Sequence, residues 1–143
     1  MALLCSMVAG AVEIEPGVSQ KLAEQRRAAV GNLCYDLKFR IPASRKEKVT
    51  GSAVIKFTYK KCGDDLQLDF QGADGQYGGV VTVNGKKRRA EWRSEHIILK
   101  ESWLKNGENA VDVAFTSGDK SLNRNEDYLY TLFVPDHARS VFP

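Results

Sequence analysis

The sequence predicts a mainly β fold, an antiparallel β-sandwich or saddle-shaped sheet with one amino-terminal helix. Two observations predict it. After residue 32 the apolar residues alternate with polar ones, as they do in half-buried strands. Turn residues also separate roughly eight short apolar runs along the chain. With 143 residues, 43% of them hydrophobic, the chain suffices for one buried core, so we expect one domain over residues 12–143.

The helix is expected from Ser19 to Val30. This stretch is rich in Ala, Gln, Glu and Arg, and Gly31-Asn32 stops it. Its apolar residues form only a narrow stripe. We therefore expect the helix to lie on the outside of the domain, with one edge packed against it.

A long hairpin should follow the helix. Apolar residues alternate with polar ones from Leu33 to Ile41 and again from Val49 to Lys60, across a polar turn at 42–47. Shorter strands are expected at 66–70, 80–83, 97–99, 110–115 and 128–134. A helical turn is expected at 102–105, a loop at 117–127, and a short turn from Asp136, as its cap, to Arg139.

The dipeptide Asn84-Gly85 predicts a hairpin with a type I′ turn, because both residue types tolerate positive φ. The charged arm after it runs to Trp92 and includes Lys86, Lys87, Arg88 and Arg89. In the whole chain 21 Lys+Arg nearly balance 18 Asp+Glu, and no nucleic-acid-binding motif accompanies the basic cluster. We expect a solvated arm and no nucleic-acid partner.

Residues 1–11 are typical of a signal-peptide remnant. A short apolar run ends in Ala9-Gly10-Ala11, which resembles a cleavage site, so we expect an exported protein, periplasmic or extracellular. The run is too short to span a bilayer, and no membrane span is expected. Cys34 and Cys62 lack metal-ligand spacing, and are expected as free thiols, with a disulfide between them as the alternative.

No complete catalytic site is expected in the chain. The only two histidines, His96 and His137, lie on separate elements without an H-E-x-x-H pair, which favours packing or surface roles over zinc binding. No G-x-S-x-G motif is present. Asp64, Asp65 and Asp69 are expected to be solvated or to accept backbone hydrogen bonds, with a paired-carboxylate hydrolase as the alternative.

The carboxyl end carries a more specific pattern. Ser121-Leu122-Asn123-Arg124-Asn125 precedes Thr131-Leu132-Phe133-Val134-Pro135, and Asp136-His137-Ala138-Arg139 precedes Phe142-Pro143. This order resembles the amino-terminal domain of the aminopeptidase N family of zinc metallopeptidases, where G-L-Y-R-S, T-Q-F-E-P, D-A-R and F-P-C-F-D-x-P follow one another. Leu22-Ala23-Glu24-Gln25-Arg26 is similar to the family's L-A-x-x-R. The resemblance covers nearly the whole chain after residue 18.

The resemblance implies a non-catalytic domain that packs on a separate zinc domain and forms part of its cleft wall. The parent would be an exported aminopeptidase that removes amino-terminal residues from peptides. Zinc would belong to that downstream domain, so this chain alone is expected to hold no cofactor and cleave nothing. The chain stops where C-F-D-x-P would begin, which indicates a boundary inside a larger protein. By resemblance the substrate-facing positions are Leu132, Phe133 and Val134, and the structural ones are Arg124, Asp136 and Arg139.

Leu132 and Val134 stand where the family has Gln and Glu. Neither side chain can accept a hydrogen bond from the substrate's ammonium group. Two interpretations stay open: an altered, more apolar first subsite, or ordinary packing in the seam between domains.

Another class of function is a stand-alone secreted binding module, for example for carbohydrate, with Tyr77, Trp92 or Trp103 as its stacking face. A purely structural interaction domain is a third. An exposed planar aromatic patch would favour the binding module, whereas an exposed apolar seam around Tyr128 to Phe142 would favour the peptidase domain.

Overall fold

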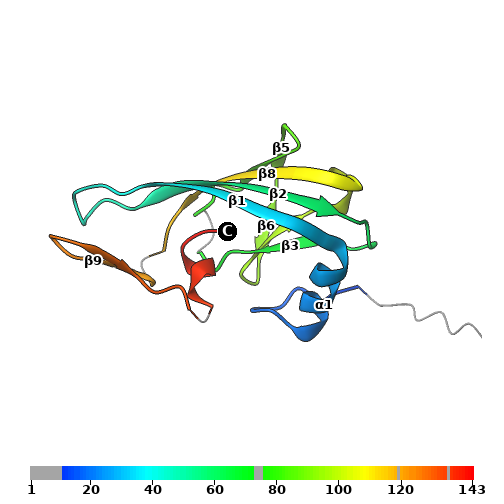
Figure 1. Cartoon of the computed structure of the whole chain (residues 1–143), viewed down its shortest axis with the longest axis horizontal. Coiled ribbons are helices and arrows are strands. Elements are labelled where there is room, and N and C mark those ends of the chain that lie inside the picture. Colours follow the sequence, from blue (N-terminus) through cyan, green and yellow to red (C-terminus); the bar gives the residue numbers. More distant parts are fainter. Residues whose placement is uncertain (1–10, 73–75, 119, 135) are drawn as a thin grey trace, which may run out of the picture.

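The computed structural model describes residues 11–72, 76–118, 120–134 and 136–143. Two antiparallel sheets face each other across the core, and a small hairpin lies at the end away from the helix (Figure 1). The five-stranded sheet has the order β1-β2-β8-β4-β5, and the three-stranded sheet has the order β3-β7-β6. The mainly β fold class with one amino-terminal α-helix is therefore confirmed.

The elements have the following bounds. The five-stranded sheet contains β1 (Val30–Arg40), β2 (Thr50–Tyr59), β4 (Val80–Val83), β5 (Lys86–Arg89) and β8 (Gly107–Thr116). The three-stranded sheet contains β3 (Leu66–Asp69), β6 (Glu91–Arg93) and β7 (His96–Leu99). The remaining elements are α1 (Gln20–Ala29), η1 (Glu101–Trp103), η2 (His137–Ser140), and the hairpin of β9 (Leu122–Arg124) with β10 (Leu129–Thr131).

Helix α1 begins and ends within one residue of its predicted bounds. The side chain of Ser19 accepts a hydrogen bond from the backbone N–H of Leu22, which satisfies one of the free donors of the first turn. Leu22 and Ala29 are its buried residues. The helix thus packs one narrow edge on the domain, as its thin apolar stripe predicts.

A β-bulge shifts the pairing register of β1 relative to β2. Gly31 pairs with Thr58 but Cys34 pairs with Lys56, so β1 holds one residue more than β2 between those pairs. Asn32 inside the bulge has a φ of 49°. Because side chains alternate along a strand, the extra residue lets apolar side chains on both sides of the bulge face the core side of the sheet.

The core fills the space between the two sheets. Along β2 the predicted inward residues are buried, and those of β8 and β7 pack against them. The largest part of this cluster consists of Ala53, Ile55, Phe57, Tyr59, Phe70, Ile97, Leu99, Val111, Val113 and Phe115. Burial of such side chains contributes about 1.5–3 kcal/mol each, so this layer holds the sheets together.

The Asn84-Gly85 turn has the expected geometry, with φ values of 49° and 77°. The strand predicted to run from this turn to Trp92 is wrong as one element. The chain leaves the five-stranded sheet after β5, and β6 joins the other sheet, with buried Ala90 at the crossing. Most of the basic arm is exposed, whereas Arg88 lies over the ring of Trp103, 5.9 Å from its centroid.

Three details of the carboxyl part also differ from the prediction. The expected loop at 117–127 contains β9, which pairs with β10. The last strand ends at Thr131 instead of residue 134. Asp136 does precede η2, but its side chain makes no capping hydrogen bond and accepts one from Arg139 instead.

The predicted signal segment lies outside the described residues except for Ala11. Within the described part of the chain, no helix has the length and apolar character needed to cross a membrane.

Candidate interaction surface

Leu132, Phe133 and Val134 lie between β10 and η2. Two backbone hydrogen bonds hold this segment: Leu132 N donates to Ser121 O at 3.4 Å, and His137 N donates to Phe133 O at 2.9 Å. Their side chains are 43%, 36% and 67% exposed. The segment is therefore tied down by its backbone while its apolar side chains face solvent.

Phe142 joins this segment to the five-stranded sheet. Its ring makes edge contacts with Phe133, Tyr35 and Phe39, at centroid distances of 5.8, 6.3 and 6.2 Å. Phe39 in turn contacts the buried ring of Phe115. A chain of rings thus runs from the exposed segment to the core.

The apolar face of β1 is more exposed than the sequence predicts. Its residues alternate as expected, but it is an edge strand, and Leu33, Tyr35 and Phe39 remain exposed, as does Ile41 directly after it. We use the name apolar surface for these residues in and directly after β1, together with the carboxyl-side residues that adjoin them through Phe142. Its members are Leu33, Tyr35, Phe39, Ile41, Leu132, Phe133, Val134 and Phe142.

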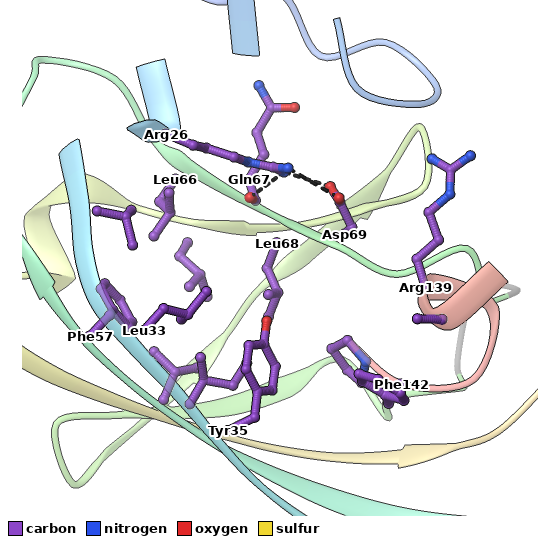
Figure 2. Close-up of a pocket in the computed structure, with 16 residues that line it drawn as sticks. Arg26, Leu33, Tyr35, Phe57, Leu66, Gln67, Leu68, Asp69, Arg139 and Phe142 are labelled. Atoms are coloured by element: carbon purple, nitrogen blue, oxygen red, sulfur yellow. Dashed lines mark hydrogen bonds and ion pairs between the residues drawn. The ribbon is translucent and has the colours of Figure 1, made fainter. Parts of the chain in front are cut away.

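A cavity of about 340 Å³ opens beside this surface. Figure 2 shows apolar side chains of both sheets around it, among them Leu33, Phe57, Leu66 and Leu68. The ion pair of Arg26 and Asp69 borders one side, and Arg139 and Phe142 border the other. Because the walls come from α1, both sheets and η2, no single stretch of sequence reveals this cavity.

Arg124 fastens the β9–β10 hairpin to the far turn of the β1–β2 hairpin. Its guanidinium group donates to three backbone oxygens, those of Pro42, Ser44 and Glu47, at 2.7–2.8 Å. The planar guanidinium group carries several N–H donors in a fixed arrangement, so this one side chain can bind three backbone acceptors. Arg124 therefore sets where the hairpin and the segment after it lie.

Arg139 plays a similar part at η2. It pairs with Asp136 at 3.0 Å and with Glu95 at 3.4 Å. The backbone of η2 also comes close to the core, since Gly118 N donates to Ser140 O at 3.1 Å. A Cβ at Gly118 would lie 2.6 Å from that oxygen, so only glycine permits this approach.

The aromatic residues that could form a carbohydrate-stacking face are all engaged in packing. Tyr77 is 4% exposed and its hydroxyl donates to Ala90 O. The indole N–H of Trp92 donates to Phe70 O, and both tryptophans pack on the core. These residues form no exposed planar patch in the described chain.

The histidines, the three aspartates and the thiols lie in separate surroundings in the described chain, apart from the pair of His96 with Asp69. His96 is buried beside Asp69, whereas His137 is exposed on η2. Asp65 pairs with Lys100 and accepts from Glu101 N, and Asp64 accepts from Val12 N. Cys34 and Cys62 are exposed free thiols. Among the described residues, no three or more His, Cys, Asp or Glu are placed to hold a metal ion.

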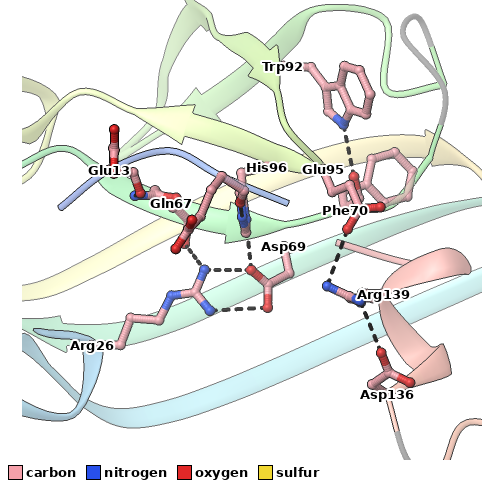
Figure 3. Close-up of polar contacts among 11 residues, drawn as sticks. Glu13, Arg26, Gln67, Asp69, Phe70, Trp92, Glu95, His96, Asp136 and Arg139 are labelled. Atoms are coloured by element: carbon pink, nitrogen blue, oxygen red, sulfur yellow. Dashed lines mark hydrogen bonds and ion pairs between the residues drawn. The ribbon is translucent and has the colours of Figure 1, made fainter. Parts of the chain in front are cut away.

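Asp69 is the carboxylate with the most perturbed environment of the three. Burial alone would raise its pKa, but hydrogen bonds and charges from His96 and Arg26 lower the pKa of Asp69 to about 2. These two partners, His96 and Arg26, lie on β7 and α1 (Figure 3). No local pattern in the sequence links residues so far apart; the cluster forms because Asp69 and His96 are direct partners across β3 and β7, which places them on one face of the sheet.

No protein-family model matches this chain, and no curated protein matches it.

Proposed function

We propose that this chain is the non-catalytic amino-terminal domain of an exported zinc aminopeptidase and that it packs on the catalytic domain through the apolar surface. The enzyme would remove amino-terminal residues from peptides, with zinc held by the catalytic domain. The observation that carries the proposal is the exposure of Leu132, Phe133 and Val134 on a backbone held in place by hydrogen bonds.

The amino-acid composition of residues 128–134 supports a protein interface at this segment. The segment 128–134 contains no charged residue, and Tyr128 and Tyr130 are exposed beside the three residues named above. Depletion of charge and enrichment in aromatic residues are typical of the buried centre of protein interfaces. Apolar side chains held in this way gain about 25 cal/mol for each Å² that a partner covers.

The same surface is also the region whose motifs resemble the aminopeptidase N family. Arg124 and Arg139 stand within those motifs, and both hold the segment's flanking elements in place. The resemblance and the exposure are independent observations, because one comes from residue order and the other from packing. Exposure does not support the carbohydrate-binding alternative in the same way, since Tyr77, Trp92 and Trp103 are engaged in packing.

The first test reads the coding sequence downstream of Pro143. The proposal expects C-F-D-x-P at once, and farther on H-E-x-x-H followed by a Glu on the next helix, the ligand set of a zinc peptidase. The full-length protein should then release amino-terminal residues from peptides, and a chelator should abolish the release. A stop codon, or an unrelated domain after Pro143, would overturn the proposal.

A second test uses the isolated chain. It should neither bind zinc nor cleave peptides. Binding of oligosaccharides by this chain, lost on Trp92→Ala, would favour the secreted binding module instead. The matched control is Tyr130→Ala, which removes an aromatic ring from the exposed hairpin and leaves the two tryptophans in place.

A further inference from the structure

Strand β1 has a strand neighbour on one side only among the described residues. It stands at the end of the order β1-β2-β8-β4-β5, and Figure 1 shows it running along β2. It has 11 residues, most of them exposed. An edge strand offers its free N–H and C=O groups to another strand. The edge of β1 is therefore a place where a further chain can extend the sheet.

The contact of β1 with β2 shows which backbone groups are free. The carbonyl oxygen of Lys38 faces β2, since it lies 2.7 Å from the position that a Cβ on Gly51 would take. In an antiparallel ladder, the backbone groups of successive residues point to opposite sides of the strand. The groups of Lys38 therefore bond β2, whereas those of Tyr35, Leu37 and Phe39 point to the free edge.

The side chains around Leu37 are complementary to themselves when two copies of β1 run antiparallel. If Leu37 lies opposite Leu37 of the second copy, Asp36 lies opposite Lys38 of the second copy. Two-fold symmetry repeats this pair with the roles exchanged. On the other face, Tyr35 lies opposite Phe39. Opposite charges and aromatic rings that face each other across strands contribute about 0.2–1 kcal/mol a pair, so both faces favour this register.

The adjoining registers bring like charges together. A centre at Asp36 would place the carboxylates of the two Asp36 residues opposite each other, and a centre at Lys38 would do the same with two ammonium groups. A centre between two residues would aim free backbone groups at groups that already bond β2. Charge and hydrogen bonding together thus select the register centred on Leu37.

The opposite edge of the same sheet does not have this property. It is formed by β5, whose four residues, Lys86–Arg89, are all basic. Any pairing of β5 with a second β5 would set basic residues opposite basic residues. Charges on an edge strand ordinarily prevent pairing in this way. On β1 the charges instead alternate in sign about Leu37 and attract a second copy.

We propose that two copies of this chain join through β1, with Leu37 at the two-fold axis, so that their five-stranded sheets become one continuous sheet. The contact is formed by backbone groups in the plane of the sheet. It goes beyond the proposed function, which uses side chains on one face, and does not depend on it. The two apolar surfaces then lie side by side on one face of the joined sheet.

Charge reversal tests the proposal on the whole chain, by sedimentation up to about 0.1 mM. The wild-type chain should be a dimer. Asp36→Lys and Lys38→Asp each set like charges opposite one another twice, and should raise the dissociation constant at least about tenfold. The two substitutions together should restore the dimer. Lys56→Asp, at an exposed position on β2, makes the same change of charge as Lys38→Asp and should have no effect.

A disulfide cross-link tests the register. Cys34→Ser with Cys62→Ser removes the two exposed thiols. In that background, Leu37→Cys should link the copies on mild oxidation, because Cα atoms of such a pair lie about 5.5 Å apart, within the range of a disulfide. Phe39→Cys is the matched control. Its two copies would lie about 14 Å apart along the strands, too far to link.

Three results would overturn the proposal. The first is a wild-type chain that stays monomeric at about 0.1 mM. The second is a dimer that both single reversals leave intact, which would indicate association through the apolar surface instead. The third is a combined variant that is folded by circular dichroism yet monomeric. If the charge variants do not fold, the cross-link decides: linking through Phe39→Cys as readily as through Leu37→Cys would exclude this register.

Discussion

The ring of Phe142 stands edge-on to the ring of Phe133, with centroids 5.8 Å apart and planes at 89°. This pair connects the end of η2 to the exposed segment before it. Phe142 also contacts Tyr35 on β1, and therefore fixes both parts of the apolar surface relative to one another. A surface held in this way is preorganised, which would reduce the ordering cost of binding any partner.

Phe142→Ala should lower the free energy of unfolding by about 2 kcal/mol, because it removes three ring contacts from a half-buried position. Urea denaturation of the isolated chain measures the change. Val134→Ala is the control, since its side chain is 67% exposed and its loss should cost less than about 0.5 kcal/mol. Equal stability of the two variants would contradict the anchoring role of Phe142.

Arg124→Ala should free the turn at 42–47, because three backbone oxygens lose their donor. Part of the site is exposed, so we expect a loss of about 1–2 kcal/mol. Hydrogen exchange of the Glu47 amide, which donates to Ser44 O, should quicken. Arg124→Lys tests the geometry, since one ammonium group cannot match the planar fork. Full stability in that variant would show that charge alone suffices.

Asp69 should make the stability depend on acidity. The pKa of Asp69 is lowered from 3.8 to about 2 by His96 and Arg26, against the opposing effect of burial. A depressed pKa adds stability above the unfolded value, and this contribution, about 2 kcal/mol, disappears as the pH falls from about 4 to about 2. Asp69→Asn should flatten the stability curve in that range. An unchanged slope in the variant would contradict the ion pair's role. Asp136→Asn, at an exposed site, is the control.

The substitution of Leu132→Gln with Val134→Glu separates the two interpretations of these residues in the full-length aminopeptidase that the proposal expects. If they line the first subsite, the new polar groups should change KM for peptides several-fold, because they can bond the substrate's ammonium group. If they only fill the seam, KM should stay constant while stability falls. Tyr128→Gln, at an exposed position of the same hairpin, is the control.

Local patterns in the sequence were sufficient to predict much of the fold. Helix α1, the β1–β2 hairpin and the Asn84-Gly85 turn follow from helical composition, alternation and the tolerance of Asn and Gly for positive φ. These signals lie within a few residues of the structure they predict. The inward residues of β2 were likewise evident, because alternation decides which side chains share a face.

The pairings between distant parts of the chain were not evident from the sequence. The crossing at Ala90 divides one charged run between two sheets, and the run itself contains no turn signal that marks it. Strand β9 was missed because three residues are too few for alternation to show. The exposure of Leu33 and Phe39 depends on β1 being an edge strand, which the strand's own residues do not reveal.

The sequence by itself determined the mainly β fold class, the amino-terminal helix, the first long hairpin and the Asn84-Gly85 turn. Only the tertiary structure decided which apolar face is covered, how Phe142 joins η2 to β1, and that His96 meets Asp69. The physical reason is that periodicity reports which side chains lie on the same side of one element. Whether that side meets another element depends on pairings between residues far apart in the chain, and only folding brings those together.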